Sequence, residues 1–272
     1  MKTFIEAKGF RIPLVGLGTW ALRGRDCARL VEQAIRIGYR HIDTAQMYEN
    51  EDEVGEGVRA SGLRPEVMVT TKIQPTLLAP PDVERSVKQS LAKLRLDHID
   101  LLVIHWPNPR VPLSETLGAM AKLKKEGYTR AIGVSNFTVA LLEEAEKVSS
   151  EPIVCNQVEC HPFLNQDKVI AACKKLGMAL VAYSPIARGG AKGNEVLETI
   201  GRAHGKSAAQ ISLRYLVQQG ISVIPRTSKR ERLEENFAIF DFDLSDAEMR
   251  EIHGLSSHND RIVDWSWSPN WD

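Results

Sequence analysis

The feature that most constrains the fold is a repeat of short apolar runs, each followed by a charged amphipathic stretch, along most of the chain. This alternation is typical of parallel strands joined by crossover helices. Most of the runs are continuous in Val, Ile and Leu, as expected for strands covered on both faces. The candidate strands are residues 14–18, 40–44, 67–72, 99–105, 130–135, 153–158, 179–184 and 222–226.

Other signals complete this architecture. Two runs at residues 3–7 and 10–13, joined at Lys8-Gly9, predict a β-hairpin before the repeat. Residues 194–219 are long enough for two helices, broken at His204-Gly205. No linker or low-complexity tract divides the chain, so we predict a single (β/α)8 TIM barrel domain over residues 1–272. Helices are predicted to begin at Asp26, Asp82, Ser114, Asn165 and Ser207.

Composition excludes several classes of function. Lys plus Arg equals Asp plus Glu at 35 each, which argues against a nucleic-acid binder. The charged start lacks the apolar run of a signal peptide, and no run of about 18 apolar residues suggests a membrane span. We therefore expect a cytoplasmic protein. The cysteines lack paired spacing, so neither disulfides nor a metal site is expected; they are Cys27, Cys155, Cys160 and Cys173.

Two glycine motifs imitate nucleotide-binding loops. The run Gly16-Leu17-Gly18-Thr19-Trp20-Ala21 fits GxGxxA, but the expected helix start after Gly24 comes too late for a Rossmann turn. The run Gly205-Lys206-Ser207 resembles the end of a phosphate loop, but Ile200 stands where that loop needs glycine. We interpret it as a helix break followed by an N-cap.

Ionisable residues stand at the carboxyl ends of the predicted strands. Asp43, Lys72 and His105 close three successive strands, and Tyr48 lies just beyond Asp43. In a barrel such residues converge on one mouth, where active sites lie. Any one of them alone is more often structural. Together they form an acid–base set with no nucleophile or metal cage.

This set suggests proton delivery to a carbonyl oxygen. A nearby Lys72 ammonium would lower the pKa of the Tyr48 phenol from about 10 towards working pH. Asp43 would pair with Lys72 and limit the cost of burying it. His105 would orient the substrate oxygen, preferably as a neutral imidazole, because a charged one would be repelled by Lys72.

A series of motifs then carries a resemblance to a known family. They are Gly16-Leu17-Gly18-Thr19-Trp20, Gly38-Tyr39-Arg40-His41-Ile42-Asp43-Thr44-Ala45 with Tyr48, Asp100-Leu101-Leu102-Val103-Ile104-His105-Trp106-Pro107, Ile132-Gly133-Val134-Ser135-Asn136-Phe137, Asn156-Gln157-Val158-Glu159, Tyr183-Ser184-Pro185 and Ile224-Pro225-Arg226. In this order they resemble the aldo-keto reductases over essentially the whole chain. The ending, with Asn259-Asp260-Arg261 and Pro269-Asn270-Trp271-Asp272, is similar to the bacterial diketogluconate and methylglyoxal reductase group.

The resemblance implies a catalytic tetrad of Asp43, Tyr48, Lys72 and His105, with Tyr48 as the general acid. It also implies NADP(H), held without a Rossmann domain. The implied nicotinamide contacts are Ser135, Asn136 and Gln157, with Tyr183 stacked beneath the ring. At the adenosine end they are Pro225, Arg226, Thr227, Ser228, Arg232, Glu235 and Asn236. Further implied cofactor contacts are Thr19, Trp20, Asp43, Ser184, Pro185, Ile186, Ala209 and Ile224.

Arg226 departs from the family pattern, because many members have lysine there. An arginine still offers a forked donor to a 2′-phosphate, so NADPH remains the expected cofactor. The departure leaves NAD(H) as a possible secondary cofactor. The expected substrate contacts are aromatic or apolar and lie beside the tetrad: Trp20, Met47, His105, Trp106 and Trp267. The tryptophans of the tail could equally be structural packing.

The expected activity is the reduction of aldehydes or ketones, such as small dicarbonyls, keto-sugars or ketoaldonates, with oxidation of secondary alcohols in reverse. The expected partner is a small carbonyl compound, and the chain is expected to be a monomer. One rival is a non-catalytic NADPH-binding regulatory subunit of the same fold. The other is a phosphate-binding isomerase barrel, for which Gly189-Gly190 is a weak candidate loop.

Overall fold

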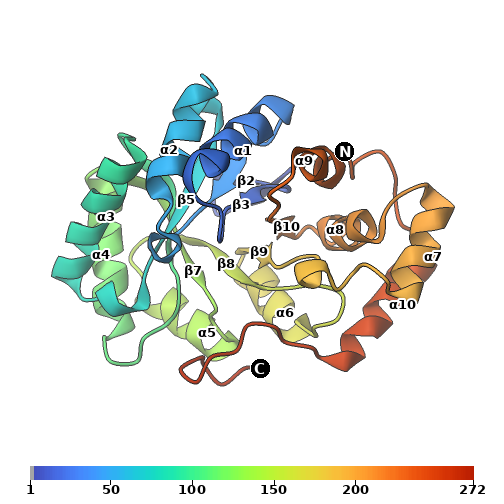
Figure 1. Cartoon of the computed structure of the whole chain (residues 1–272). Coiled ribbons are helices and arrows are strands. Elements are labelled where there is room, and N and C mark those ends of the chain that lie inside the picture. The colour runs from blue at the N-terminus through green and yellow to red at the C-terminus, as the bar shows by residue number, and fades with distance from the viewer. Residues whose placement is uncertain (1–2) are drawn as a thin grey trace.

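The structure, a computed structural model, describes residues 3–272. An 8-stranded parallel sheet runs in chain order from β3 to β10 and curls into a barrel surrounded by helices (Figure 1). The strands are β3 (Leu17–Gly18), β4 (His41–Asp43), β5 (Met68–Ile73), β6 (Ile99–Ile104), β7 (Thr129–Ser135), β8 (Ile153–Glu159), β9 (Ala179–Tyr183) and β10 (Ser222–Val223). The predicted (β/α)8 fold is confirmed.

The helices follow the strands in the predicted alternation. They are α1 (Gly24–Ile37), α2 (Glu51–Ala60), α3 (Pro80–Leu94), α4 (Leu113–Lys125), α5 (Val139–Val148), α6 (Asp167–Lys175), α7 (Glu195–His204), α8 (Ala208–Gln218), α9 (Arg230–Phe237) and α10 (Asp246–Gly254). Within residues 3–272, none of these helices combines the length and apolar character that a membrane crossing requires.

The barrel closes where the chain around β3 meets the chain around β10. The Gly16 amide donates to the Val223 carbonyl at 2.9 Å, and the Gly18 amide donates to the Pro225 carbonyl at 3.1 Å. A Cβ atom at residue 18 would lie 2.7 Å from the Ile224 carbonyl oxygen. Gly18 therefore serves the close approach of two strands, and not the turn of a dinucleotide fingerprint.

Strand side chains alternate between two apolar layers. In β6, Leu101 and Val103 belong to the cluster inside the barrel, whereas Leu102 and Ile104 belong to the cluster beneath the helices. Because both faces of each strand are buried, the sequence shows a continuous apolar run there instead of an alternating one.

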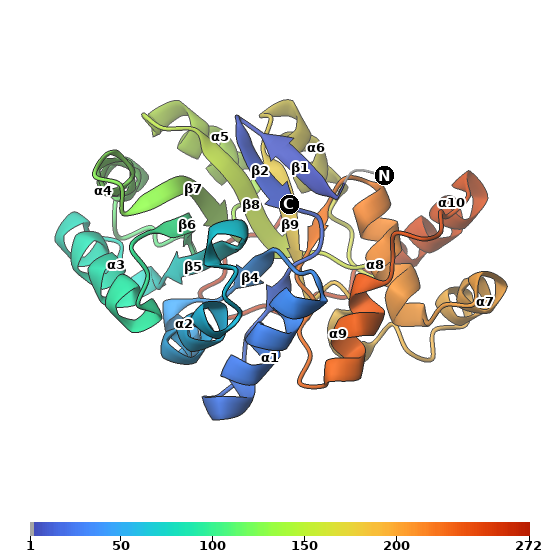
Figure 2. The same cartoon turned by 90° about the horizontal axis from the view of Figure 1, so that it is seen from above.

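The predicted hairpin consists of β1 (Phe4–Ala7) and β2 (Phe10–Pro13). Its Ala7 and Ile12 side chains join the inner apolar cluster beside Met68, the first residue of β5. Figure 2 shows the hairpin lying against β8 and β9. The amino end of the barrel is thus filled by apolar packing, which leaves the carboxyl ends of the strands for polar residues.

Several predicted helix starts are wrong. Asp26 and Asp82 each lie inside the first turn of their helices, α1 and α3. An acidic side chain in the first turn is stabilised by the helix dipole just as one at the N-cap is, so residue type alone does not distinguish the two positions.

The other predicted starts give a mixed result. Ser114 lies within α4, which begins at Leu113, and Asn165 lies just before the N-cap of α6, Gln166. Ser207 does cap α8, through a capping box with Gln210. The break between α7 and α8 is also confirmed, because Gly205 ends α7 in a left-handed conformation.

Gly55→Ala tests the packing of α2 on α3. An added Cβ would lie 2.0 Å from the Leu94 carbonyl oxygen, so the backbone would have to move. We expect the free energy of unfolding to fall by about 1 to 3 kcal/mol. The matched control is Gly118→Ala in α4, where the added Cβ meets nothing within 4 Å. That change should raise the free energy by about 0.4 to 1 kcal/mol. Denaturant titration measures both, and undiminished stability of Gly55→Ala would contradict the packing described.

Candidate active site

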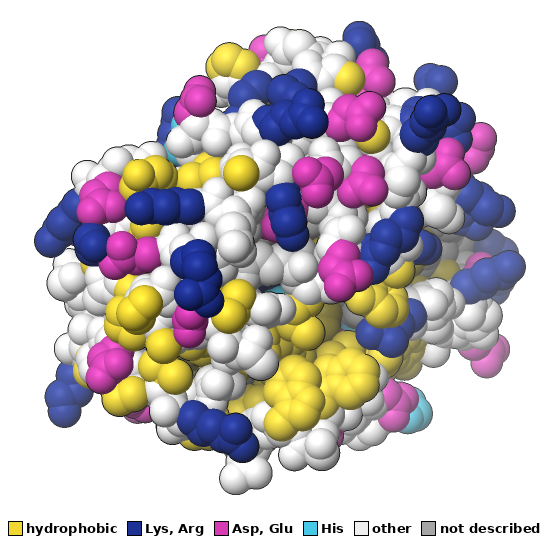
Figure 3. Space-filling view, turned by 60° about the vertical axis from the view of Figure 1, so that its left-hand side comes forward, with side chains coloured by type: hydrophobic (Ala, Val, Ile, Leu, Met, Phe, Trp, Pro, Cys, Tyr) yellow, Lys and Arg dark blue, Asp and Glu magenta, His cyan; other side chains and the backbone are white. Residues whose placement is uncertain are grey.

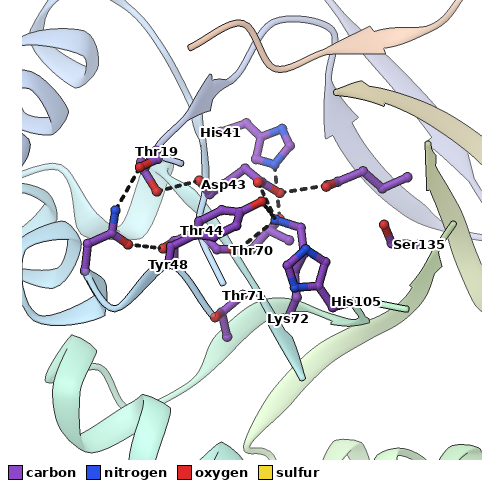
Figure 4. Close-up of polar contacts among 12 residues, drawn as sticks. Thr19, His41, Asp43, Thr44, Tyr48, Thr70, Thr71, Lys72, His105 and Ser135 are labelled. Atoms are coloured by element: carbon purple, nitrogen blue, oxygen red, sulfur yellow. Dashed lines mark hydrogen bonds and ion pairs between the residues drawn. The ribbon is translucent and has the colours of Figure 1, made fainter. Parts of the chain in front are cut away.

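The four residues of the predicted tetrad come together at the carboxyl end of the barrel (Figure 4). Asp43 ends β4, Lys72 lies near the end of β5, His105 follows β6, and Tyr48 ends a short 3-10 helix, η1 (Gln46–Tyr48). The Lys72 Nζ lies 2.5 Å from Asp43 Oδ1 and 3.4 Å from the Tyr48 hydroxyl. It also donates to the Thr44 carbonyl at 2.8 Å.

Lys72 and Asp43 form a buried ion pair, with exposed side-chain fractions of 0% and 1%. Burial favours the neutral amine, but the Asp43 carboxylate holds the pKa of Lys72 above its ordinary value. The second carboxylate oxygen accepts a hydrogen bond from Gln157 Nε2 at 2.7 Å. A buried pair is tolerable only when its remaining bonding capacity is satisfied in this way.

Tyr48 corrects one expectation. Burial raises the pKa of the phenol above its ordinary value, and the Lys72 ammonium only partly opposes that rise. Lys72 therefore acts in the predicted direction, but its effect is outweighed. The phenol keeps its proton at neutral pH, and Lys72 reduces the free-energy cost of releasing it.

His105 is buried and stands against Tyr48. The two ring centroids are 5.6 Å apart in an edge-on arrangement. Burial, followed by the Lys72 charge, holds the pKa of His105 well below its ordinary value. The imidazole is thus neutral at working pH, as expected from the sequence. Its Nδ1 has no hydrogen-bond partner within residues 3–272.

The residues predicted to contact nicotinamide lie on three adjacent strands or directly after one of them. Ser135 and Gln157 are on β7 and β8, and Asn136 follows Ser135 with a left-handed φ of 62°. The Asn136 amide donates to the His105 carbonyl at 2.9 Å and to Ser135 Oγ at 3.1 Å. The Tyr183 hydroxyl at the end of β9 donates to Asn136 Oδ1 at 2.8 Å. These bonds connect the cofactor candidates to the tetrad.

The residues predicted for the adenosine end lie at and beyond β10. Arg226 is exposed, and its Nε donates to the Trp20 carbonyl at 3.2 Å, which leaves the two Nη groups for an anion. Arg232 is also exposed and pairs with Glu235 at 2.6 Å. Ser228 is exposed as well, whereas Pro225, Thr227 and Asn236 are buried.

The other predicted cofactor residues are spread around the same loops. Thr19 is buried and its hydroxyl donates to the Asp43 carbonyl at 2.9 Å. Ile224 packs in the inner barrel cluster, so its side chain is a core group. The remaining residues lie in the loop after β9 or in the first turn of α8 and are Ser184, Pro185, Ile186 and Ala209.

The predicted substrate contacts form two groups. Trp20 and Met47 are exposed by 50% and 44%, on the loops that follow β3 and β4. Trp106 is buried and packs edge-on against Trp267, with centroids 5.0 Å apart. On the face shown in Figure 3, apolar side chains with aromatic rings among them gather around a hollow, while basic and acidic groups are interspersed elsewhere.

A model of the aldo/keto reductase family matches residues 14–257. The chain belongs to this family. It is 41% identical over 266 residues to methylglyoxal reductase DkgB of Escherichia coli O157:H7, covering 96% of this chain and 99% of that protein. It is 41% identical over 250 residues to glyoxal reductase of Bacillus subtilis (strain 168), covering 91% and 90%.

A solved structure described as a putative 2,5-diketo-D-gluconic acid reductase B has a TM-score of 0.97 and 44% identity, and the match covers 100% of this chain and 98% of that one. The family recognised from the motifs is thus confirmed, as is the group within it. Membership makes the chain an oxidoreductase acting on carbonyl groups.

Sequence reasoning missed two buried polar groups beside this aldo/keto reductase site. Asn50 donates to the Thr19 carbonyl at 2.8 Å and accepts from Thr44 Oγ1 at 2.7 Å, so it joins the loop carrying Trp20 to the loop carrying Tyr48. Its position just before a helix was the only available signal. Glu159, quoted within a family motif but given no role, ends β8 as a fully buried carboxylate.

No group of three or more His, Cys, Asp or Glu side chains within residues 3–272 is arranged to hold a metal ion.

The protonation of His105 is directly testable. In the wild type, NMR of the imidazole should show a neutral ring throughout pH 6 to 8. In Lys72→Met the pKa of His105 should rise but stay below its ordinary value, because burial is the larger cause. The unfolded chain takes up this proton near pH ~6.5. As the pH falls below that value, His105 therefore lowers the free energy of unfolding. A wild-type ring that titrates near its ordinary value would contradict this description.

Proposed function

We propose that the chain reduces aldehydes and ketones to alcohols with NADPH, and oxidises secondary alcohols in reverse. The proposed substrates are small dicarbonyls such as methylglyoxal, keto-sugars and ketoaldonates. The observation that carries this proposal is the Tyr48 hydroxyl 3.4 Å from the buried Lys72 ammonium, beside a neutral His105. The names of the two reductase relatives support the substrate class. We further propose that residues 1–272 act as one domain and as a monomer.

The residues present fit a nicotinamide cofactor. Tyr183 supplies a partly exposed aromatic ring, with Ser135, Asn136 and Gln157 on the neighbouring strands. Arg226 keeps two Nη groups free of the bond to Trp20, which suits a forked contact to a 2′-phosphate. These features support NADPH, with NADH as a secondary cofactor.

The proposed mechanism divides the work among the tetrad. When bound, the nicotinamide supplies a hydride to the carbonyl carbon. Tyr48 holds its proton at the phenolic oxygen and donates it to the carbonyl oxygen. Lys72 stabilises the phenolate that forms, and Asp43 keeps Lys72 charged and in place. The N–H of the neutral His105 ring orients the carbonyl oxygen.

Tyr48→Phe tests this assignment. Removing the hydroxyl preserves the ring but deletes the acid, so turnover should fall by about 10²- to 10⁴-fold. Lys72→Met should also remove most turnover, because the phenol loses the charge that opposes the effect of burial. Fluorescence titration should show NADPH binding unchanged in Tyr48→Phe. Near-normal turnover in that variant would make another residue, with His105 the first candidate, the proton donor.

Arg226→Ala tests the choice of cofactor. The Michaelis constant for NADPH should rise by about 10- to 150-fold relative to that for NADH, for a lost charge-assisted bond of roughly 1.5 to 3 kcal/mol. The bond from Arg226 to Trp20 is lost with either cofactor, so the difference isolates the phosphate. The matched control is Arg230→Ala, an exposed position of α9 paired with Glu234, which should leave the preference unchanged. Equal effects of Arg226→Ala on both cofactors would exclude a phosphate contact.

A further inference from the structure

The buried carboxylate of Glu159 accepts hydrogen bonds from the chain after α10. Its Oε1 lies 2.7 Å from the Ile262 amide, and its Oε2 lies 2.7 Å from the Val263 amide. Within β8 and the loop that follows, its partner is His161, whose Nε2 lies 2.9 Å from Oε1. We call residues 259–272 the tail. Two of the three bonds to this carboxylate therefore come from tail backbone.

Glu159 depends on these bonds because it is fully buried. Burial by itself would favour the neutral acid, but the bonds from His161, Ile262 and Val263 hold the pKa of Glu159 below its ordinary value. A tail that moved away would leave a carboxylate with one protein partner in a position built to exclude water. Docking of the tail and the charge of Glu159 thus stabilise each other.

Beyond Val263, the tail runs to Trp106, the residue that follows His105 of the tetrad. Figure 1 shows it passing α6 and ending beside α5. Trp267 and Trp271 pack edge-on against Trp106, which follows His105, with centroids 5.0 and 6.1 Å apart. At the far end, Asp272 accepts from the Val139 amide at the start of α5, at 2.9 Å.

The segment between the two attachments has its own internal order. Trp265 and Ser268 exchange backbone and side-chain bonds, each 2.9 Å long, and this closes a turn around Trp267. The Trp271 indole donates to Asp264 at 3.0 Å. These internal bonds hold the tail in one conformation. Its position on the barrel is set by its attachments to Glu159 and to the start of α5.

We infer that Glu159 is a positioning residue that sets substrate range, by fixing the tail and with it the Trp267 side of the site. Through this anchor the enzyme would favour carbonyl compounds with an apolar or aromatic substituent that lies against Trp267. Small dicarbonyls do not need that contact. The inference rests on the proposed carbonyl reduction and assigns Glu159 no contact with substrate or cofactor.

The hydrogen bond between Ile262 and Glu159 can be removed by a substitution in the tail, which leaves the sequence of β8 unchanged. Ile262→Pro removes the N–H that Glu159 Oε1 accepts, whereas Ile262→Ala keeps it and serves as the matched control. Hydrogen–deuterium exchange of the full-length protein should show faster exchange across residues 263–272 in the proline variant alone. Melting temperature reports whether both variants are folded. Equal exchange in the two variants would overturn the anchoring role of this bond.

Activity assays then test the effect on substrate range. For an aromatic aldehyde, kcat/KM should fall about tenfold in Ile262→Pro, mainly through KM. For methylglyoxal it should stay within about twofold, and NADPH binding should be unchanged, because the tetrad is untouched. Ile262→Ala should behave like the wild type with both substrates. Parallel losses with both substrates in the proline variant would show a general structural defect and overturn the inference.

Glu159→Gln provides a second route to the same result. The amide places a donor where one tail N–H needs an acceptor, so this variant should reproduce the exchange and the selectivity of Ile262→Pro. A Glu159→Gln variant with wild-type exchange and selectivity would overturn the inference. If the wild type reduced neither carbonyl compound, the proposed function would fail, while the exchange measurements would still decide whether Glu159 anchors the tail.

Discussion

The ion pair between Lys72 and Asp43 is the interaction on which the rest of the site depends. Neither group reaches water, and losing one partner of such a pair typically costs about 3 to 5 kcal/mol. The surroundings accordingly satisfy both groups, through the Thr44 carbonyl on the ammonium and Gln157 on the carboxylate. A fixed positive charge beside the Tyr48 hydroxyl is the result. In the proposed mechanism, that charge lowers the free-energy cost of releasing the proton of the buried phenol.

The barrel separates packing from chemistry along its axis. The hairpin and the inner apolar cluster fill the amino end, and the closing seam at Gly18 brings β3 against the chain after β10. Asp43, Tyr48, Lys72 and His105 lie at the carboxyl end, where loops from distant parts of the sequence meet. Two buried side chains hold such segments in place. Asn50 donates to the Thr19 carbonyl in the loop that carries Trp20, and Glu159 accepts from the Ile262 amide of the tail.

The pattern of strands was sufficient to predict the barrel, because strands buried on both faces have continuous apolar sequences. Asp43, Lys72 and His105 could be predicted to lie close together, because the carboxyl ends of parallel strands meet at one mouth of a barrel. Helix starts at Asp26 and Asp82 were wrong because the first turn and the N-cap favour the same residue types. The raised pKa of Tyr48 could not be predicted, because it depends on burial in the folded structure. The partners of Glu159 could not be predicted either, because the bond from Ile262 spans 103 residues and leaves no local sequence pattern.

The central claim is that Lys72 acts on catalysis through Tyr48, and a double-mutant cycle tests it most directly. Single-turnover rates with saturating NADPH would be measured for the wild type, Tyr48→Phe, Lys72→Met and the double variant. If the two residues act as a unit, the double variant should react within about threefold of Tyr48→Phe alone. Losses that multiply in the double variant would show that Lys72 contributes independently of the phenol, and would contradict this account.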